Sequence, residues 1–144
     1  MDDVIKIIST YFKSNEGTID ESSFAAPTNE VQLKTFEQIF FITLPPDYRN
    51  FLKITNGYEG FIGESYVNFS SINEIISYQE IYEHYPWILY IGNNGAGEMY
   101  VIDKRAEKFQ FGILSYIGDE NDFVPLGYSF EEFIKHLYDN DFWE

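Results

Sequence analysis

Hydrophobic residues in the first third of the chain recur every three or four positions. This spacing covers residues 2–14 and again residues 29–41, which predicts two amphipathic helices joined by the loop-like segment 15–30. A third helix is expected to open at Pro45-Pro46, because the first N–H groups of a helix have no partner inside it. Asn56-Gly57 is expected to end this helix, since glycine tolerates the left-handed conformation best.

The pattern then changes to short, aromatic-rich runs that are typical of strands. The segments YEGFIG and YVNF come first. Three longer runs follow at 87–91, 98–103 and 109–116, and a short fourth run lies at 123–126. Pro125 in the last run favours the edge of a sheet, because proline has no N–H to donate to a neighbouring strand. These runs predict a sheet whose strands are mostly neighbours in the sequence.

Two capping boxes mark the start of further helices, because their side chains satisfy N–H groups that a helix start leaves unpaired. Ser71-x-x-Glu74 predicts a helix that ends before Pro86, and Ser129-x-x-Glu132 predicts a final helix over 130–139. Helices, then mostly adjacent strands, then a helix favour a single α+β domain over residues 1–144. Its central sheet is expected to be largely antiparallel and flanked by helices.

Composition narrows the class of protein. Of the 144 residues, 44% are apolar and 19% aromatic, which is enough for a substantial core. The absence of cysteine excludes disulfides, zinc ribbons and thiol catalysis. The N-terminus begins with two acidic residues rather than the basic patch of a signal peptide, and no segment reaches the roughly 18 apolar residues of a membrane span. We therefore expect a soluble, cytoplasmic protein.

The net charge of −15 is large for a chain of this size. It disfavours nucleic acid and anionic membranes as partners, because both are bound through Lys and Arg. The charge is also uneven: residues 1–53 carry 8 acidic and 5 basic residues, whereas residues 54–144 carry 16 and 4. This asymmetry fits either general solubility or a surface that attracts a basic partner.

The segment IGNNGAGEMYVID, residues 91–103, has the glycine content of a phosphate-binding loop. A dinucleotide-binding loop, however, has the spacing G-x-G-x-x-G and leads into a helix whose N-terminus faces the pyrophosphate. Here the spacing is G-x-x-G-x-G, a strand-like run follows, and no lysine appears before Lys104. Asn94-Gly95 instead predicts a hairpin between strands 87–91 and 98–103, because both residue types accept positive φ.

No motif in the chain marks an enzyme. His84 and His136 each lack a second ligand at metal-binding spacing, so no metal or cofactor is expected. The run GDENDF, 118–123, lacks the pattern of a calcium loop and fits a solvated turn or an acidic contact patch. There is no G-x-S-x-G elbow. The 24 acidic residues leave a catalytic carboxylate pair open, but nothing marks one.

Three segments together resemble the SUKH superfamily. LPPDYRNFLKITNG (44–57) is similar to its L-P-x-D-Y-x-x-F-L-x-x-x-N-G segment, IGNNGAGEMYVID (91–103) to its I-G-x-x-G-x-G-x-x-Y-x-x-D hairpin, and SFEEFIKHL (129–137) to its closing S-F-x-x-F-I-x-x-L helix. The order and spacing match over nearly the whole chain. The resemblance implies an α+β fold with a central sheet flanked by helices. It also implies that the motif residues shape the helices and the hairpin and are not catalytic.

For most bacterial members, the resemblance implies immunity to secreted polymorphic toxins: the protein binds a cognate toxin in the cytoplasm and blocks it. Many such toxins are nucleases, which are basic because they hold nucleic acid. The acidic half of this chain suits such a partner. The alternative is a non-catalytic regulatory scaffold like the fungal regulators of cell-wall glucan synthesis. The resemblance identifies neither the toxin nor the oligomeric state.

The residues that contact the toxin are expected among acidic and aromatic side chains in predicted loops and strand ends. Acidic residues would supply complementary charge, and aromatic residues are the usual anchors of protein interfaces. The acidic candidates are Glu64, Glu98, Asp103, Asp119, Glu120 and Asp122. The aromatic candidates are Tyr66, Tyr100 and Phe123.

Overall fold

A seven-stranded antiparallel sheet has its strands in the order of the sequence, so each strand pairs with its neighbours along the chain. The computed structural model describes residues 2–13 and 24–140. Residues 1, 14–23 and 141–144 lie outside the described residues, and with them most of the loop expected over 15–30. The strands are β1 (Phe12–Lys13), β2 (Tyr58–Ile62), β3 (Ser65–Phe69), β4 (Ile88–Asn93), β5 (Glu98–Asp103), β6 (Gln110–Ser115) and β7 (Val124–Gly127).

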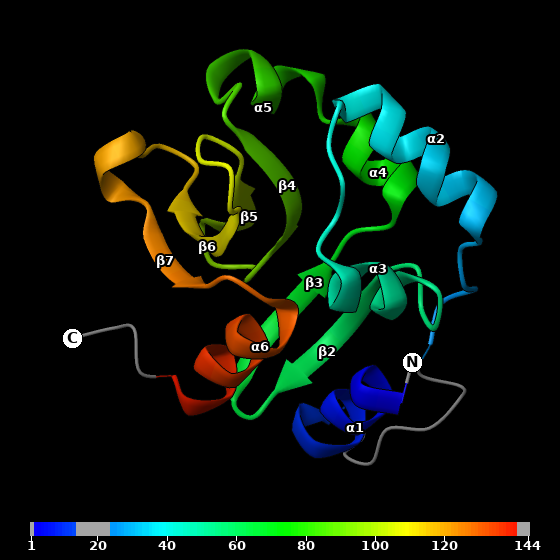
Figure 1. Ribbon diagram of the computed structural model, residues 1–144. Coiled ribbons are helices and arrows are strands. Elements are labelled where there is room, and N and C mark those ends of the chain that lie inside the picture. The colour runs from blue at the N-terminus through cyan, green and yellow to red at the C-terminus, as the bar shows by residue number, and fades with distance from the viewer. Residues whose placement is uncertain (1, 14–23, 141–144) are drawn as a thin grey trace.

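Helices cover both faces of this sheet (Figure 1). In the described part of the chain they are α1 (Asp2–Tyr11), α2 (Glu30–Phe40), α3 (Pro46–Leu52), α4 (Ile72–Ser77), α5 (Gln79–His84) and α6 (Phe130–Asp139), with a one-turn 3₁₀ helix, η2 (Glu120–Asp122). The helices α1, α3 and α6 pack on one another, and α6 also lies against β2, β6 and β7. In contrast, α5 packs against β4 at the far end of the molecule.

The three central strands, β4 to β6, are buried on both faces. Successive residues of a strand point to opposite faces, so alternate residues of β5 enter different clusters. Tyr100 and Ile102 join the large core beneath α1, α3 and α6, whereas Met99 and Val101 join a second cluster beside α5. This explains why the strands read as continuous apolar runs rather than as an alternating pattern.

The α+β class and the antiparallel sheet predicted from the sequence are confirmed. The strand predicted over 98–103 and the helix predicted over 130–139 have the expected bounds. The strand that contains Pro125 lies at the edge of the sheet. The first capping box also forms, because Ser71 Oγ accepts the N–H of Glu74 at 3.2 Å and the Glu74 carboxylate accepts the N–H of Ser71 at 3.0 Å.

Two of the predicted helices are interrupted by aromatic packing. Phe12 leaves the first helix for β1, where its ring lies 5.7 Å from that of Phe51. The helix expected to run toward Pro86 divides into α4 and α5 at Tyr78. The Tyr78 ring turns in against Tyr90, with 4.3 Å between the ring centroids. In both places tertiary packing overrides the local helical spacing.

Two helix ends also differ from expectation. Ser129 caps α6 by accepting the N–H of Glu132 at 3.1 Å, but the Glu132 carboxylate lies 3.4 Å from the Ser129 hydroxyl rather than on its backbone N–H, so the second box is incomplete. The helix α3 ends at Leu52, before the predicted stop. Asn56 instead accepts the N–H of Ile72 at 3.0 Å and ties this segment to the start of α4.

Candidate functional site

Three connections of the chain meet at one end of the sheet and form two adjoining hollows. The β2–β3 turn, the β4–β5 loop and the end of α6 border a hollow of about 210 Å³. The β6–β7 loop borders a second hollow of about 390 Å³, and Ile113 lines both. The acidic side chains that line them are Glu64, Glu98 and Asp122, and no Lys or Arg is among the described lining residues. A basic side chain of a partner would complement this surface.

The hairpin that Asn94-Gly95 predicted is confirmed by the pairing of β4 with β5. Its turn differs from the expected one, because only Gly95 and Gly97 have positive φ, 71° and 96°, and Asn94 does not. The Asn94 amide organises the loop: its oxygen accepts the N–H of Ala96 at 2.9 Å, and its nitrogen donates to the Glu98 carboxylate at 2.7 Å. Hydrogen bonds within the loop therefore use N–H groups that a phosphate loop would direct at its ligand, as expected for a hairpin. The same amide holds Glu98 at the edge of the second hollow.

Tyr66 and Tyr100 both line the smaller hollow but differ in exposure. Tyr100 is 2% exposed and packs against Phe69 and Phe133, and this burial raises the pKa of its hydroxyl. It is a core residue, so the expectation of an exposed aromatic anchor at this position is corrected. Tyr66 is partly exposed. Its hydroxyl donates a hydrogen bond to the Glu59 carboxylate, which raises the pKa of Tyr66 to about 12.

The three acidic residues of the β6–β7 loop are largely engaged within the fold. The Asp119 carboxylate accepts the N–H of Asn121 at 2.8 Å, and the Asp122 carboxylate accepts the N–H of Asp119 at 2.8 Å, which caps η2. Glu120 forms an ion pair with Arg105 at 3.3 Å. The run GDENDF is therefore a folded turn, and Asp122 is the member that also lines an acidic hollow.

The structure does not bring Asp103 and Phe123 to these hollows. Asp103 lies at the other end of β5 from Glu98. There its carboxylate accepts two hydrogen bonds from the Arg105 guanidinium, at 3.0 and 2.8 Å, and one from the Arg105 backbone N–H at 2.9 Å. Burial disfavours the ionised carboxylate, but the hydrogen bonds and charge of Arg105 outweigh it and lower the pKa of Asp103. The guanidinium lies 3.9 Å over the Trp87 ring, which meets Phe123 edge-on at 5.8 Å. These residues form a packed cluster of their own.

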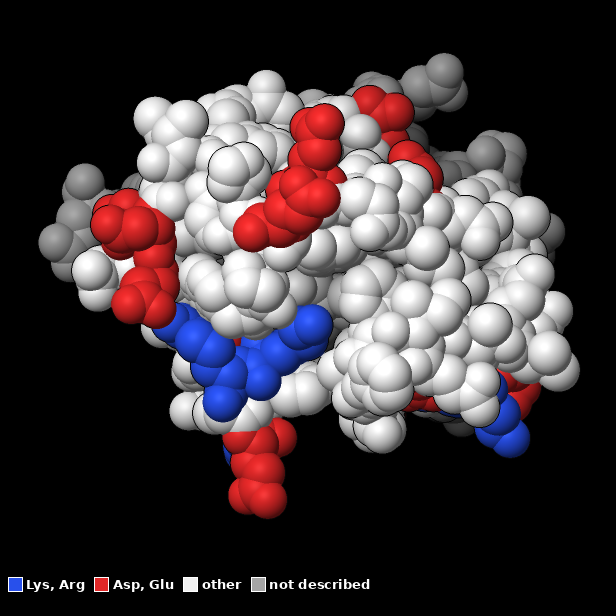
Figure 2. All heavy atoms as spheres, turned by 90° about the horizontal axis from the view of Figure 1, so that it is seen from above, with Lys and Arg blue, Asp and Glu red and all other residues white. Residues whose placement is uncertain are grey.

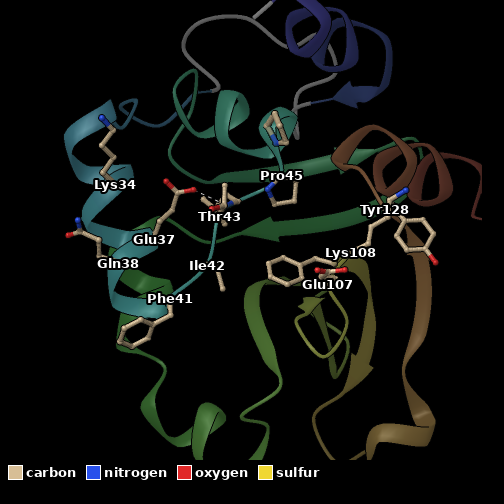
Figure 3. Close-up of a pocket in the computed structure, with 13 residues that line it drawn as sticks. Lys34, Glu37, Gln38, Phe41, Ile42, Thr43, Pro45, Glu107, Lys108 and Tyr128 are labelled. Carbon is tan, nitrogen blue, oxygen red and sulfur yellow. Dashed lines mark hydrogen bonds between the residues drawn. The ribbon is translucent and has the colours of Figure 1, made fainter.

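A larger groove, of about 840 Å³, was not predicted from the sequence. Figure 3 shows it between the end of α2 with segment 42–46 on one side and the β5–β6 loop with Tyr128 on the other. Phe41 also lines it and is 94% exposed. The adjacent residues Phe40 and Phe41 could have indicated this surface. Neighbouring residues of a helix point about 100° apart, so only one of the two rings can face the core and the other is expected to be exposed.

The charges on the surface are mixed. Figure 2 shows acidic side chains scattered around a short run of basic side chains on the face viewed from above, rather than gathered in one patch. The net charge of −15 therefore does not by itself locate a binding surface. The acidic end of the sheet is distinguished by its hollows and by the lack of Lys and Arg among their described lining residues.

Neither metal chemistry nor membrane insertion has support in the described part of the chain. No group of three or more His, Cys, Asp or Glu residues within 2–13 and 24–140 is arranged to hold a metal ion. No helix in these ranges has both the length and the apolar character to cross a bilayer.

Comparison with known proteins identifies a matching family and a related bacterial protein. The sequence profile of the SMI1/KNR4 family (SUKH-1) matches residues 27–136. The chain is also 31% identical over 127 residues to the uncharacterized protein YnaB of Bacillus subtilis (strain 168), across 84% of this chain and 85% of YnaB. The matched residues begin before α2 and end within α6, so they include α3 and the β4–β5 hairpin.

Proposed function

Because the chain belongs to the SMI1/KNR4 (SUKH-1) family, we propose that it is an immunity protein that binds a cognate protein toxin in the cytoplasm and neutralises it by occlusion. The family includes immunity proteins, and its members are generally non-catalytic. The partner proposed here is a basic toxin of the nuclease type, whose Lys and Arg residues hold nucleic acid. An immunity protein that covers those residues prevents the toxin from binding its nucleic-acid substrate.

The observation that carries this proposal is the acidic end of the sheet. Glu64 is exposed on the β2–β3 turn, and Glu98 and Asp122 lie on the neighbouring loops around the two hollows. The helix α6 ends at the same place, with Asn140 in the lining, and a helix C-terminus carries partial negative charge. Tyr66 adds a partly exposed aromatic ring of the type that anchors protein interfaces.

The first test is co-expression of this protein with the toxin encoded by the adjacent gene. We expect growth to be restored and a stoichiometric complex to be recovered on gel filtration. Unchanged toxicity together with no complex would refute the immunity role. If no toxin gene is adjacent and an endogenous protein is recovered instead, the chain is a regulatory scaffold of the kind described above.

The second test locates the contact surface by charge reversal. Glu64→Lys should slow association with the toxin about threefold or more in low salt, because rim charges act mainly on the association rate. Glu64 suits this test because its side chain forms no hydrogen bond or ion pair within the described residues. Glu107→Lys, at an exposed position of the β5–β6 loop at the opposite end of β5 from Glu98, is the matched control. Equal slowing by both variants would show that net charge, and not this surface, steers the toxin.

A further inference from the structure

The large groove beside α2 has an apolar floor and lies away from the acidic hollows. The segment after α2 contributes Ile42 and Pro45, and the opposite side contributes Phe109 and Tyr128. The register of β5 with β6 pairs Glu98 with Ser115 at the acidic end and Asp103 with Gln110 at the end that leads into the groove. A volume of about 840 Å³ lies within the range of roughly 300–1,000 Å³ that is typical of ligand-binding pockets.

Phe41 at the edge of this groove combines two unfavourable features. Its φ of 55° is left-handed, a conformation that favours glycine or asparagine at the end of a helix. Its side chain is 94% exposed, so no packing within the described residues compensates for the backbone conformation. A large aromatic ring held out in water at the end of a rigid helix is a suitable anchor for another protein.

The β5–β6 loop opposite Phe41 is basic, although the chain as a whole is strongly acidic. Of its basic residues, Lys108 lines the groove, and Lys104 lies beside it with its ammonium over the ring of Phe40. The β5–β6 loop holds Lys104, Arg105 and Lys108, three of the nine Lys and Arg residues. Arg105 is already paired with Asp103 and Glu120.

The two lysines lie instead over aromatic rings. The distance from Nζ to the ring centroid is 5.7 Å for Lys104 over Phe40 and 4.5 Å for Lys108 over Tyr128. Neither forms an ion pair with a carboxylate of the described residues, and burial lowers the pKa of Lys104. The remaining charges of the groove largely offset one another. Glu37 pairs with Arg49 at 3.2 Å, and Glu107 lies on the same loop as Lys108, on the side of the groove opposite Lys34.

We propose that this groove binds an extended segment of a partner protein in which an apolar or aromatic side chain is flanked by carboxylates. The apolar side chain packs between Phe41 with Ile42 and Phe109, and the carboxylates pair with Lys104 and Lys108. This surface is separate from the acidic hollows, and its occupant has the opposite charge to the proposed toxin. The proposal therefore stands or falls independently of the immunity role.

The test uses three capped hexapeptides, EDLWED, KKLWKK and EDSSED, titrated into the full-length, isotope-labelled protein and followed by NMR. We expect EDLWED to shift the backbone amide signals of Thr43 and Lys108 at millimolar concentration. The basic peptide has the wrong charge, and EDSSED lacks the apolar anchor, so both should bind at least about tenfold more weakly. Absence of shifts with EDLWED, or equal shifts with all three peptides, would overturn the proposal.

Two variants then assign the binding to the groove. The double variant Lys104→Glu/Lys108→Glu should weaken EDLWED binding about tenfold, since two charge pairs become repulsive. The double variant Lys6→Glu/Lys135→Glu, at exposed positions on α1 and α6, makes the same change in net charge and should leave binding unchanged. Equal loss in both pairs would show attraction by net charge alone and would overturn the assignment to this groove.

Phe41→Gly separates the anchor from the fold, because glycine suits the left-handed backbone. It should keep the native spectrum and weaken EDLWED binding about fivefold through loss of the exposed ring. Sedimentation of the unmodified protein tests whether a second copy of this chain, rather than a partner, occupies the groove. A concentration-dependent dimer that Phe41→Gly abolishes would assign the groove to self-association and overturn the proposal.

Discussion

The carboxylate of Asp47 accepts the N–H of Phe130 at 3.1 Å, across 83 residues of sequence. Its second oxygen accepts the N–H of Glu131 at 3.0 Å, while Ser129 caps the next N–H along. The start of a helix leaves these N–H groups without partners and carries partial positive charge, so a carboxylate there is doubly favourable. Asp47 of the L-P-x-D-Y segment thereby joins α3 to α6.

Replacing Asp47 should destabilise the whole domain. Asp47→Ala leaves two N–H groups of α6 without an acceptor, and we expect the free energy of unfolding to fall by about 2 kcal/mol. Asp47→Asn keeps one acceptor oxygen and should cost less. Urea denaturation measures both, with Glu131→Ala at an exposed position of the same helix turn as the control. A loss for Asp47→Ala no larger than that of the control would contradict the role given to this carboxylate.

Gly92→Ala should disrupt the junction between β3 and β4. These strands share only the pairs Asn68 with Asn93 and Phe69 with Gly92. A Cβ atom at Gly92 would lie 2.5 Å from the Asn68 carbonyl oxygen, which cannot move without breaking the strand pairing. We expect a loss of about 3 kcal/mol in the free energy of unfolding, measured by urea denaturation.

Gly97→Ala in the same hairpin is the comparison for that variant. Gly97 has a φ of 96°, but a Cβ atom there would meet nothing within 4 Å. Backbone strain alone should cost about 1 kcal/mol. If both substitutions lower the free energy of unfolding by the same amount, the contact with the Asn68 carbonyl is not the reason that position 92 requires glycine.

Phe41→Gly should make the protein more stable. The substitution relieves a left-handed backbone conformation at the end of α2 and removes a ring that is 94% exposed. We expect a gain of about 1 kcal/mol, seen as a higher thermal midpoint. Asn140 is the other residue outside glycine with positive φ among those described, and asparagine already tolerates this conformation. Asn140→Gly should therefore gain less, and a larger gain at Asn140 would contradict the account of Phe41.

The Asp103–Arg105 pair should make stability depend on pH in the acid range. Arg105 lowers the pKa of Asp103 in the folded protein below its ordinary value of 3.8, despite the opposing effect of burial. A lowered folded pKa stabilises the fold above the unfolded pKa, and this contribution is lost as pH falls through the folded pKa. The stability difference between the protein and Asp103→Asn should therefore be largest at neutral pH and shrink below about pH 4. Urea denaturation at several pH values measures it, and a constant difference would rule the pair out as the cause.

The elements that could be predicted from the sequence are those whose signals are local. The helix α6 has its cap at Ser129 and its apolar spacing within one short segment, and the β4–β5 hairpin has its glycines next to two apolar runs. The strand β1 and the break at Tyr78 could not be predicted, because each depends on a distant ring, Phe51 or Tyr90. A periodic pattern does not report such contacts.

The residues of the candidate surface could be predicted only in part from the sequence. Glu64 and Glu98 could be grouped because both were expected in turns at strand ends. Tyr100 was misplaced because β5 is covered on both faces, so neither set of alternate residues is exposed. The groove was missed because it depends on the left-handed end of α2, and nothing in the residue types around Phe41 favours that conformation.

The match between sheet order and sequence order has a consequence for when the domain folds during synthesis. As the chain leaves the ribosome, each new strand finds its pairing partner already synthesised, so the sheet can extend one strand at a time. The Asp47 carboxylate, however, lacks these partners until the N–H groups of Phe130 and Glu131 are synthesised, 83 and 84 residues later. Proteolysis of ribosome-stalled chains should show resistance arising in one step, once α6 has left the exit tunnel. The proposed binding of a toxin would then belong to finished copies of this domain and not to chains still being made.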